Sequence, residues 1–142
     1  MIEINNLTKE RINKKEFEKI SEMVLNGEKN KKAEISLAIV DSRKIKTLNK
    51  KYRKKDKATD VLSFQYDVPS LWNKDFLGEI IICPKQVKKN AKELGGTFGR
   101  EMNKVLIHGI LHLLGFDHEK NNKEAKIMQK KEDFYLSKIK TK

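Results

Sequence analysis

The stretch Ile107-His-Gly-Ile-Leu-His-Leu-Leu-Gly-Phe-Asp-His118 holds all three histidines of this 142-residue chain. His108 and His112 lie four residues apart, so on a helix both imidazoles leave the same face, one turn apart. Gly115 can adopt a positive φ and end that helix, which would let the chain reverse and bring His118 back toward the first two. The spacing therefore predicts a three-histidine site for a divalent metal with one position open, an arrangement typical of catalytic metals.

The residue beside the first histidine separates this pattern from zinc proteases. The run His112-x-x-Gly115-x-x-His118 matches the second half of a known protease zinc signature, but those enzymes carry a Glu after the first histidine that activates water. Here that position is Gly109, which costs about 1 kcal/mol relative to Ala inside a helix and cannot move a proton. The pattern disfavours peptide hydrolysis, and it leaves two explanations for Gly109: another part of the molecule approaches it closely, or the reaction needs no carboxylate at that point.

The net charge of +12 points to a polyanionic partner, most simply RNA or DNA. The densest basic run, residues 50–55, contains five cations and Tyr52, and it can follow a phosphate backbone or simply form a solvated helix end. Scattered lysines can also reflect a biased genome. The charge alone therefore supports a nucleic-acid partner only modestly.

The single cysteine, Cys83, excludes an internal disulfide and fits a reducing cytosol. Its apolar neighbours, residues 80–82, predict a buried structural thiol rather than a reactive one. No stretch approaches the roughly 20 apolar residues of a membrane span, and residues 1–15 lack the apolar core of a signal peptide. We therefore expect a cytoplasmic location and no membrane partner.

Hydrophobic periodicity predicts one α+β domain over residues 1–142, with a small mixed sheet of about four strands, about five helices and a zincin-like histidine helix. The last of the four strands is nearly all apolar and is expected to lie inside the sheet. The stretch from Gln65 to Phe76 predicts an exposed loop. The expected strands cover residues 2–4, 35–39, 61–64 and 77–82.

Capping residues predict where the helices begin. Pro84 suits the first turn of one helix, and Tyr52 and Leu94 are expected on inward helix faces. The expected caps are Asn13, Asp41, Thr97 and either Asn121 or Asn122.

Three blocks of sequence resemble the YbeY endoribonucleases, which are bacterial rRNA maturation factors. His108–His118 resembles the family signature H-G-x-L-H-L-x-G-[YF]-D-H, Leu48–Phe64 is similar to the block N-x-x-Y-R-x-K-D-x-P-T-D-V-L-S-F-P, and Leu77–Cys83 resembles the L-G-D-I strand. The order and spacing agree over essentially the whole chain.

The chain departs from the family pattern at three positions. Ala58 and Gln65 replace prolines, which we expect to alter loop stiffness rather than chemistry. Glu79 replaces Asp, which puts in doubt any contact that needs the shorter side chain.

The resemblance implies that His108, His112 and His118 bind one zinc ion together with a water, and that Arg53 is catalytic. The implied activity is metal-dependent cleavage of single-stranded RNA, linked to 16S rRNA 3′-end maturation and ribosome quality control in the cytoplasm. The implied partners are rRNA, the ribosome or its small-subunit proteins, and assembly factors.

The residues themselves leave several roles open. Arg53 can clamp a phosphate with its planar fork or be a surface arginine in a basic run. Asp117 can orient a metal ligand or merely shape the turn. The general base remains unassigned, because activated water, the RNA 2′-hydroxyl and a distant carboxylate would each serve.

Two other functions are compatible with the pattern. One is a zinc peptidase of unusual type, against which Gly109 argues. The other is a non-catalytic ribosome-assembly factor that binds rRNA and uses zinc to stabilise its fold, although structural zinc usually has four protein ligands and Cys83 is the only thiol.

Overall fold

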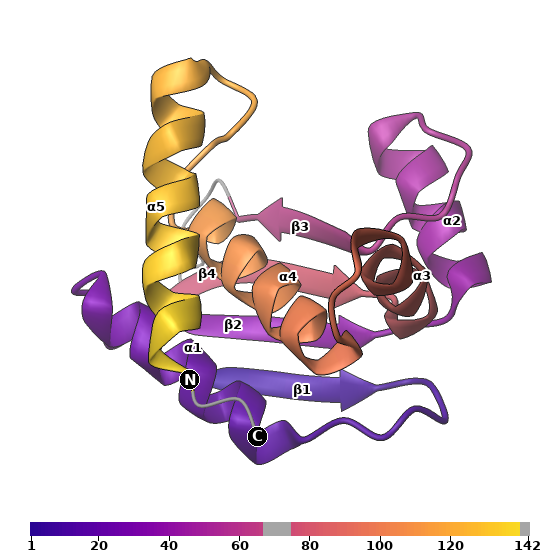
Figure 1. Ribbon diagram of the computed structural model, residues 1–142, viewed down its shortest axis with the longest axis horizontal. Coiled ribbons are helices and arrows are strands. Elements are labelled where there is room, and N and C mark those ends of the chain that lie inside the picture. Colours follow the sequence, from indigo (N-terminus) through magenta and orange to yellow (C-terminus); the bar gives the residue numbers. More distant parts are fainter. Residues whose placement is uncertain (67–74, 140–142) are drawn as a thin grey trace.

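The computed structural model describes residues 1–66 and 75–139, which form a four-stranded sheet with packed helices (Figure 1). The predicted α+β class is confirmed, with four strands and five helices in this part of the chain. Most of the loop expected between Gln65 and Phe76 lies outside the described residues. In chain order the elements are β1 (Ile2–Asn6), α1 (Lys14–Gly27), β2 (Glu34–Ile39), α2 (Ser42–Arg53), β3 (Val61–Gln65), β4 (Phe76–Ile82), α3 (Pro84–Leu94), α4 (Phe98–Leu113) and α5 (Asn122–Lys138).

Strand β4 lies inside the sheet, whose order is β1-β2-β4-β3. The first three strands of this order run parallel, and β3 pairs antiparallel with β4. An interior strand covered on both faces needs apolar side chains on both, and Ile80, Ile81 and Ile82 provide them. The predicted interior position of this strand is confirmed, and β3 is an edge strand.

The alternating side chains of β4 divide the core into two layers. Ile80 and Ile82 are buried on the side of α4, in a cluster that also holds residues of α1 and α5. Ile81 belongs to a smaller cluster on the opposite face, where it packs with Ile45 of α2 and Leu62 of β3. Figure 1 shows α4 crossing the sheet and α5 lying over one end of α4. Helix α4 is therefore enclosed between the sheet and the last helix.

Helix α4 lies directly against the sheet because a glycine faces the central strand. Leu106 and Ile110 of α4 are fully buried. A Cβ added at Gly109 would lie 3.0 Å from Cγ2 of Ile80 and 3.1 Å from its Cδ1. In a close-packed core such a contact means that Ile80 would have to shift to admit a larger residue. Of the two explanations for Gly109, the structure shows the close approach, and the partner is the middle of β4.

The helix starts predicted from capping residues are confirmed. At each start the cap side chain accepts a hydrogen bond from the backbone N–H three residues later, which satisfies one unpaired donor of the first turn. Pro84 opens α3, as expected. The four capping residues are Asn13, Asp41, Thr97 and Asn121.

Two residues expected on inward helix faces are exposed. Leu94 is 70% exposed and Tyr52 is 55% exposed. The Tyr52 ring packs edge-on against Phe64 of β3, with centroids 5.3 Å apart. Both residues lie in the last turn of their helices. Helical periodicity predicts the apolar face of a helix, but it does not show how far along the helix that face is covered. The inward assignment of these two residues was wrong.

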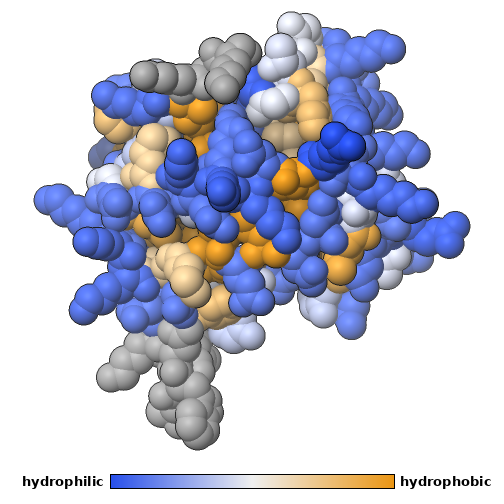
Figure 2. Space-filling view, turned by 90° about the horizontal axis from the view of Figure 1, so that it is seen from below, coloured by the Kyte–Doolittle hydropathy of each residue, from blue (hydrophilic) through white to orange (hydrophobic). Residues whose placement is uncertain are grey.

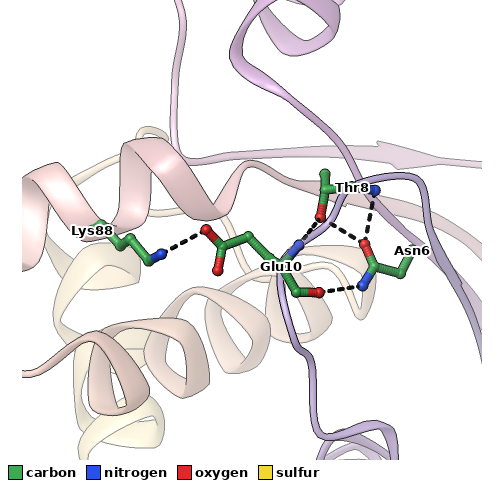
Figure 3. Close-up of polar contacts among 4 residues, drawn as sticks. All are labelled: Asn6, Thr8, Glu10 and Lys88. Carbon is green, nitrogen blue, oxygen red and sulfur yellow. Dashed lines mark hydrogen bonds and ion pairs between the residues drawn. The ribbon is translucent and has the colours of Figure 1, made fainter.

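A polar network fixes the loop between β1 and α1 (Figure 3). The side-chain oxygen of Asn6 accepts hydrogen bonds from the backbone N–H and the hydroxyl of Thr8, at 3.0 and 2.8 Å. The side-chain amide of Asn6 donates to the backbone carbonyl of Glu10 at 2.8 Å. The Glu10 carboxylate pairs with Lys88 of α3 at 2.6 Å. The network therefore ties the loop that leaves the β1 edge to a helix from the second half of the chain.

The surface seen from below is largely hydrophilic, with small apolar patches between polar side chains (Figure 2). Within residues 1–66 and 75–139, no helix is both long enough and apolar enough to cross a membrane.

We predict that Gly109→Ala lowers the free energy of unfolding by about 1–2 kcal/mol, because overpacking against Ile80 outweighs the gain in helix propensity. The matched control is Gly99→Ala in the first turn of the same helix, where an added Cβ meets nothing within 4 Å. That control is expected to be neutral or stabilising by up to about 1 kcal/mol. Urea unfolding of both variants measures the difference, and equal stabilisation by the two substitutions would contradict the close packing.

Candidate metal centre

The end of α4 and the turn after it hold the histidines in place. The N–H of Gly115 donates to the carbonyl of His112 at 3.0 Å, and the N–H of Phe116 donates to that of Leu111 at 3.1 Å. This pair of hydrogen bonds ends a helix when the first of the two donor residues has a positive φ. That residue is Gly115, and its φ is 106°. The predicted helix stop is confirmed, and the chain turns there toward His118.

His108, His112, His118 and Arg53 line one cavity of about 470 Å³. The cavity lies where the second half of α4 meets the edge strand β3 and the segment that follows α2. Lysines 55 and 57 also line it, as do the carboxylates of residues 60 and 119. The structure thus brings together all four residues singled out in the sequence.

The three histidines share the cavity without forming a finished ligand set. The rings of His108 and His118 lie edge to face, with centroids 4.9 Å apart. Over residues 1–66 and 75–139, no three side chains of His, Cys, Asp or Glu are gathered closely enough to hold an ion. The His118 side chain is 44% exposed against 29% for His108, and it follows the turn rather than standing on the helix. Two of the histidines thus stand on the helix, and the third lies beyond the turn that ends it.

The surroundings of His112 favour a neutral, oriented imidazole. Burial lowers the pKa of His112 below its ordinary value, and the nearby charges of His108 and Arg53 also lower it. Together these effects outweigh the contacts that raise this pKa. Because a carbonyl only accepts, Nδ1–H of His112 donates to the Phe116 carbonyl at 3.1 Å. Nε2 then keeps a free lone pair, which is the form of histidine that binds a metal.

His108 contacts a buried carboxylate from the last helix. Its Nδ1 pairs with Oε1 of Glu132 on α5, and Glu132 is only 4% exposed. As at His112, the ring nitrogen that remains for another partner is Nε2. The two helical histidines therefore each have one nitrogen engaged by the protein and one left over, which suits a pair of metal ligands.

Arg53 is anchored to the edge strand. Its Nη2 donates to the backbone carbonyl of Ser63 at 2.8 Å, and its guanidinium carbon lies 5.8 Å from the centroid of the Phe64 ring. A guanidinium carries five N–H donors, so one hydrogen bond leaves most of them available to the cavity. Arg53 is thus an exposed arginine that is held against β3.

Three residues whose roles the sequence left open make no hydrogen bond to a histidine ring. The Asp117 carboxylate accepts the Glu119 N–H at 2.9 Å, which shapes the turn, and its charge also acts to raise the pKa of His112. Glu79 lies on the face of β4 opposite α4, in a separate groove toward α2. Cys83 is a free thiol, fully buried and 3.6 Å from the Ser42 hydroxyl, which confirms the predicted structural thiol.

Gln65 joins the edge strand to the end of the histidine helix. Its side-chain amide donates to the carbonyls of His112 at 3.0 Å and Leu113 at 3.4 Å. Carbonyls in the last turn of a helix lack the next backbone donor, so this amide supplies one from another element. We expected the replacement of proline at this position to affect only loop stiffness, and that expectation was too narrow.

Neither Glu132 nor Gln65 was identified from the sequence as part of the site. A signal for Glu132 exists, because it interrupts the buried stripe of Met128, Tyr135 and Leu136 on α5. An acidic side chain at a core position needs a polar partner. No local pattern marks Gln65, whose contact exists only because β3 ends beside the end of α4.

Comparison with known proteins identifies one family. The family described as "Endoribonuclease YbeY" matches residues 3–140. A protein of that name from Aquifex aeolicus is 39% identical over 94% of this chain and 88% of its own length. Another, from Thermodesulfovibrio yellowstonii, is 49% identical over 75% of this chain and 67% of its own length. A solution structure of a Thermotoga maritima protein is similar with a TM-score of 0.71 and 34% identity, over 96% of this chain and 87% of that one.

We predict that Gly115→Ala lowers the free energy of unfolding by about 1–2 kcal/mol, because an L-residue is strained at a positive φ. Gly96→Ala is the control, since that glycine has no positive φ and its added Cβ would meet only the Glu101 side chain, at 3.4 Å and beyond. Chemical unfolding of the metal-free proteins measures both. An equal, small effect of the two substitutions would remove Gly115 from its assigned role in the turn.

Proposed function

The chain belongs to the family of YbeY endoribonucleases, as the resemblance predicted, and we propose that it is a metal-dependent endoribonuclease that cleaves single-stranded RNA. The observation that carries the proposal is the single cavity in which three histidines lie near an anchored arginine. Imidazoles suit a divalent transition metal, and a guanidinium suits a phosphate. The two kinds of group together suit a phosphodiester substrate.

His108, His112 and His118 are the residues that would hold the metal, and zinc is an ion that three neutral imidazoles bind in catalytic sites. Two observations support this assignment: the engaged Nδ1 atoms of His108 and His112, and the lowered pKa of His112. His118 lines the same cavity from the turn after α4, and it would supply the third ligand. When bound, the ion would supply Lewis-acid chemistry at a phosphate oxygen or lower the pKa of a water.

The protein's own groups would bind and orient the RNA backbone. Arg53 offers a planar pair of N–H donors that matches two phosphate oxygens, and its contacts with Ser63 and Phe64 limit its rotation. Lys55 and Lys57 line the same cavity and add positive charge for the strand on either side of the bound phosphate. This placement favours the phosphate-binding interpretation of the basic segment.

The peptidase alternative has no support in the structure. The water-activating Glu of zinc proteases would stand at Gly109, where even a Cβ would press on Ile80. The remaining alternative, a non-catalytic assembly factor, is separated from the proposal by a direct assay. RNA cleavage abolished by a chelator and restored by zinc supports the enzyme, whereas RNA binding without chelator-sensitive cleavage supports the assembly factor.

The family resemblance extends the proposal to a cellular role. We place the RNA cleavage in 16S rRNA 3′-end maturation and ribosome quality control in the cytoplasm, with small-subunit proteins and assembly factors as partners. The net positive charge of the chain is compatible with binding to the polyanionic rRNA.

We predict that Arg53→Ala retains zinc and fold but cleaves single-stranded RNA at least about 100-fold more slowly, as expected when a donor to a charged transition state is lost. Arg53→Lys keeps the charge without the planar fork and should recover only part of the rate. The measurement is a time course of cleavage at saturating zinc. An unchanged rate in Arg53→Ala would remove this residue from the mechanism.

We predict that His112→Ala no longer binds stoichiometric zinc, because one ligand of a three-histidine site is lost. Elemental analysis after gel filtration measures the zinc content, with Arg53→Ala as the matched variant that keeps it. The same His112→Ala preparation controls for contaminating nucleases in the cleavage assay. Retention of one zinc per chain would contradict the three-histidine assignment.

A further inference from the structure

Glu132 is a buried acid on a helix face that is otherwise apolar. It lies on α5 among Met128, Tyr135 and Leu136, which are all buried. Its carboxylate pairs with Nδ1 of His108 on α4. Burial of a carboxylate is unfavourable unless hydrogen bonds compensate it, so its place in the core depends on that contact.

We propose that Glu132 is a positioning residue that holds His108 in the tautomer whose Nε2 is free to bind the metal. An ionised carboxylate can only accept a hydrogen bond, so Nδ1 of His108 carries the hydrogen and donates it. Nε2 then has the lone pair, and rotation of the ring would break the contact. This inference rests on the proposed metal centre and names the residue that sets the orientation of its first histidine.

The role is one that packing of α5 does not require. The helix is held to α1 by other polar contacts, in which the Tyr135 hydroxyl and the Lys131 ammonium both reach the carboxylate of Glu28. An apolar residue at position 132 would continue the buried stripe without any cost of desolvating a charge. The carboxylate is therefore better explained by its effect on His108 than by docking of the helix.

The two helical histidines use different acceptors for the same purpose. His112 donates to a backbone carbonyl of its own turn, at Phe116, which no side-chain substitution removes. His108 depends on a side chain from the C-terminal helix, 24 residues away in sequence. The orientation of His108 can therefore be changed by mutation without altering either histidine.

The test compares wild type with Glu132→Gln and Glu132→Ala, and uses Tyr135→Phe as the matched control on α5. Tyr135→Phe removes the hydroxyl that contacts Glu28 and leaves the contact with His108 intact. Long-range ¹H–¹⁵N spectra of the metal-free proteins report which ring nitrogen of His108 carries the hydrogen. Competition with a chromophoric chelator gives the zinc affinity of each protein.

We expect wild type and Tyr135→Phe to show His108 with its hydrogen on Nδ1 and to bind zinc equally well. Glu132→Ala should show a mixture of tautomers and bind zinc about 10–100-fold more weakly, the usual effect of losing such a partner. Glu132→Gln should lie between, because an amide can either accept from or donate to Nδ1. It also provides the comparison if the alanine variant does not fold.

An unchanged His108 tautomer and unchanged zinc affinity in both Glu132 variants would overturn the proposal. An equal loss of zinc affinity in Tyr135→Phe would also overturn it, by showing that general loosening of α5 is the cause. If wild type itself binds no zinc, the proposed metal centre fails. The spectra of the metal-free proteins still decide whether Glu132 sets the tautomer of His108.

Discussion

The arrangement of the whole cavity depends on how closely α4 packs against the central strand. The contact of Gly109 with Ile80 places the helix backbone directly on β4. His108 precedes that glycine and His112 follows it by less than one turn, so a displacement of the helix would move both imidazoles relative to Arg53, which ends α2 and is hydrogen-bonded to the edge strand. The same contact leaves no space for the carboxylate that zinc proteases use. One packing constraint thus places the two helical histidines and disfavours one kind of chemistry.

The remaining groups of the site come from other elements and meet around this helix. Arg53 is anchored through Ser63 of β3, and Gln65 at the end of that strand reaches the last turn of α4. Glu132 comes from α5 and contacts His108. Only His118 stands on an exposed turn. Rigid elements therefore support the arginine and two of the histidines, whereas the third lies beyond the turn at Gly115.

Most of the fold follows from local patterns in the sequence, whereas the supporting contacts of the site do not. Apolar residues 80–82 predict the interior strand, capping residues predict the helix starts, and the histidine spacing predicts which residues share a cavity. Tyr52 and Leu94 show the limit of helical periodicity. The periodicity predicts which face of a helix is apolar, but not whether the last turn still has a surface to pack against. Gln65 and Glu132 act through contacts between elements distant in sequence, and these depend on the packing of β3 and α5 beside α4. Only the acidic residue in an apolar stripe leaves a trace in the sequence.

The central claim is that three histidines hold one divalent ion beside an anchored arginine. Anomalous diffraction at the zinc absorption edge, from crystals of the zinc-loaded protein, tests it most directly. The account predicts one peak about 2.0–2.1 Å from a ring nitrogen of each of His108, His112 and His118, with the Arg53 guanidinium facing the same cavity. A peak held by other residues, or one that His118 does not approach, would contradict it.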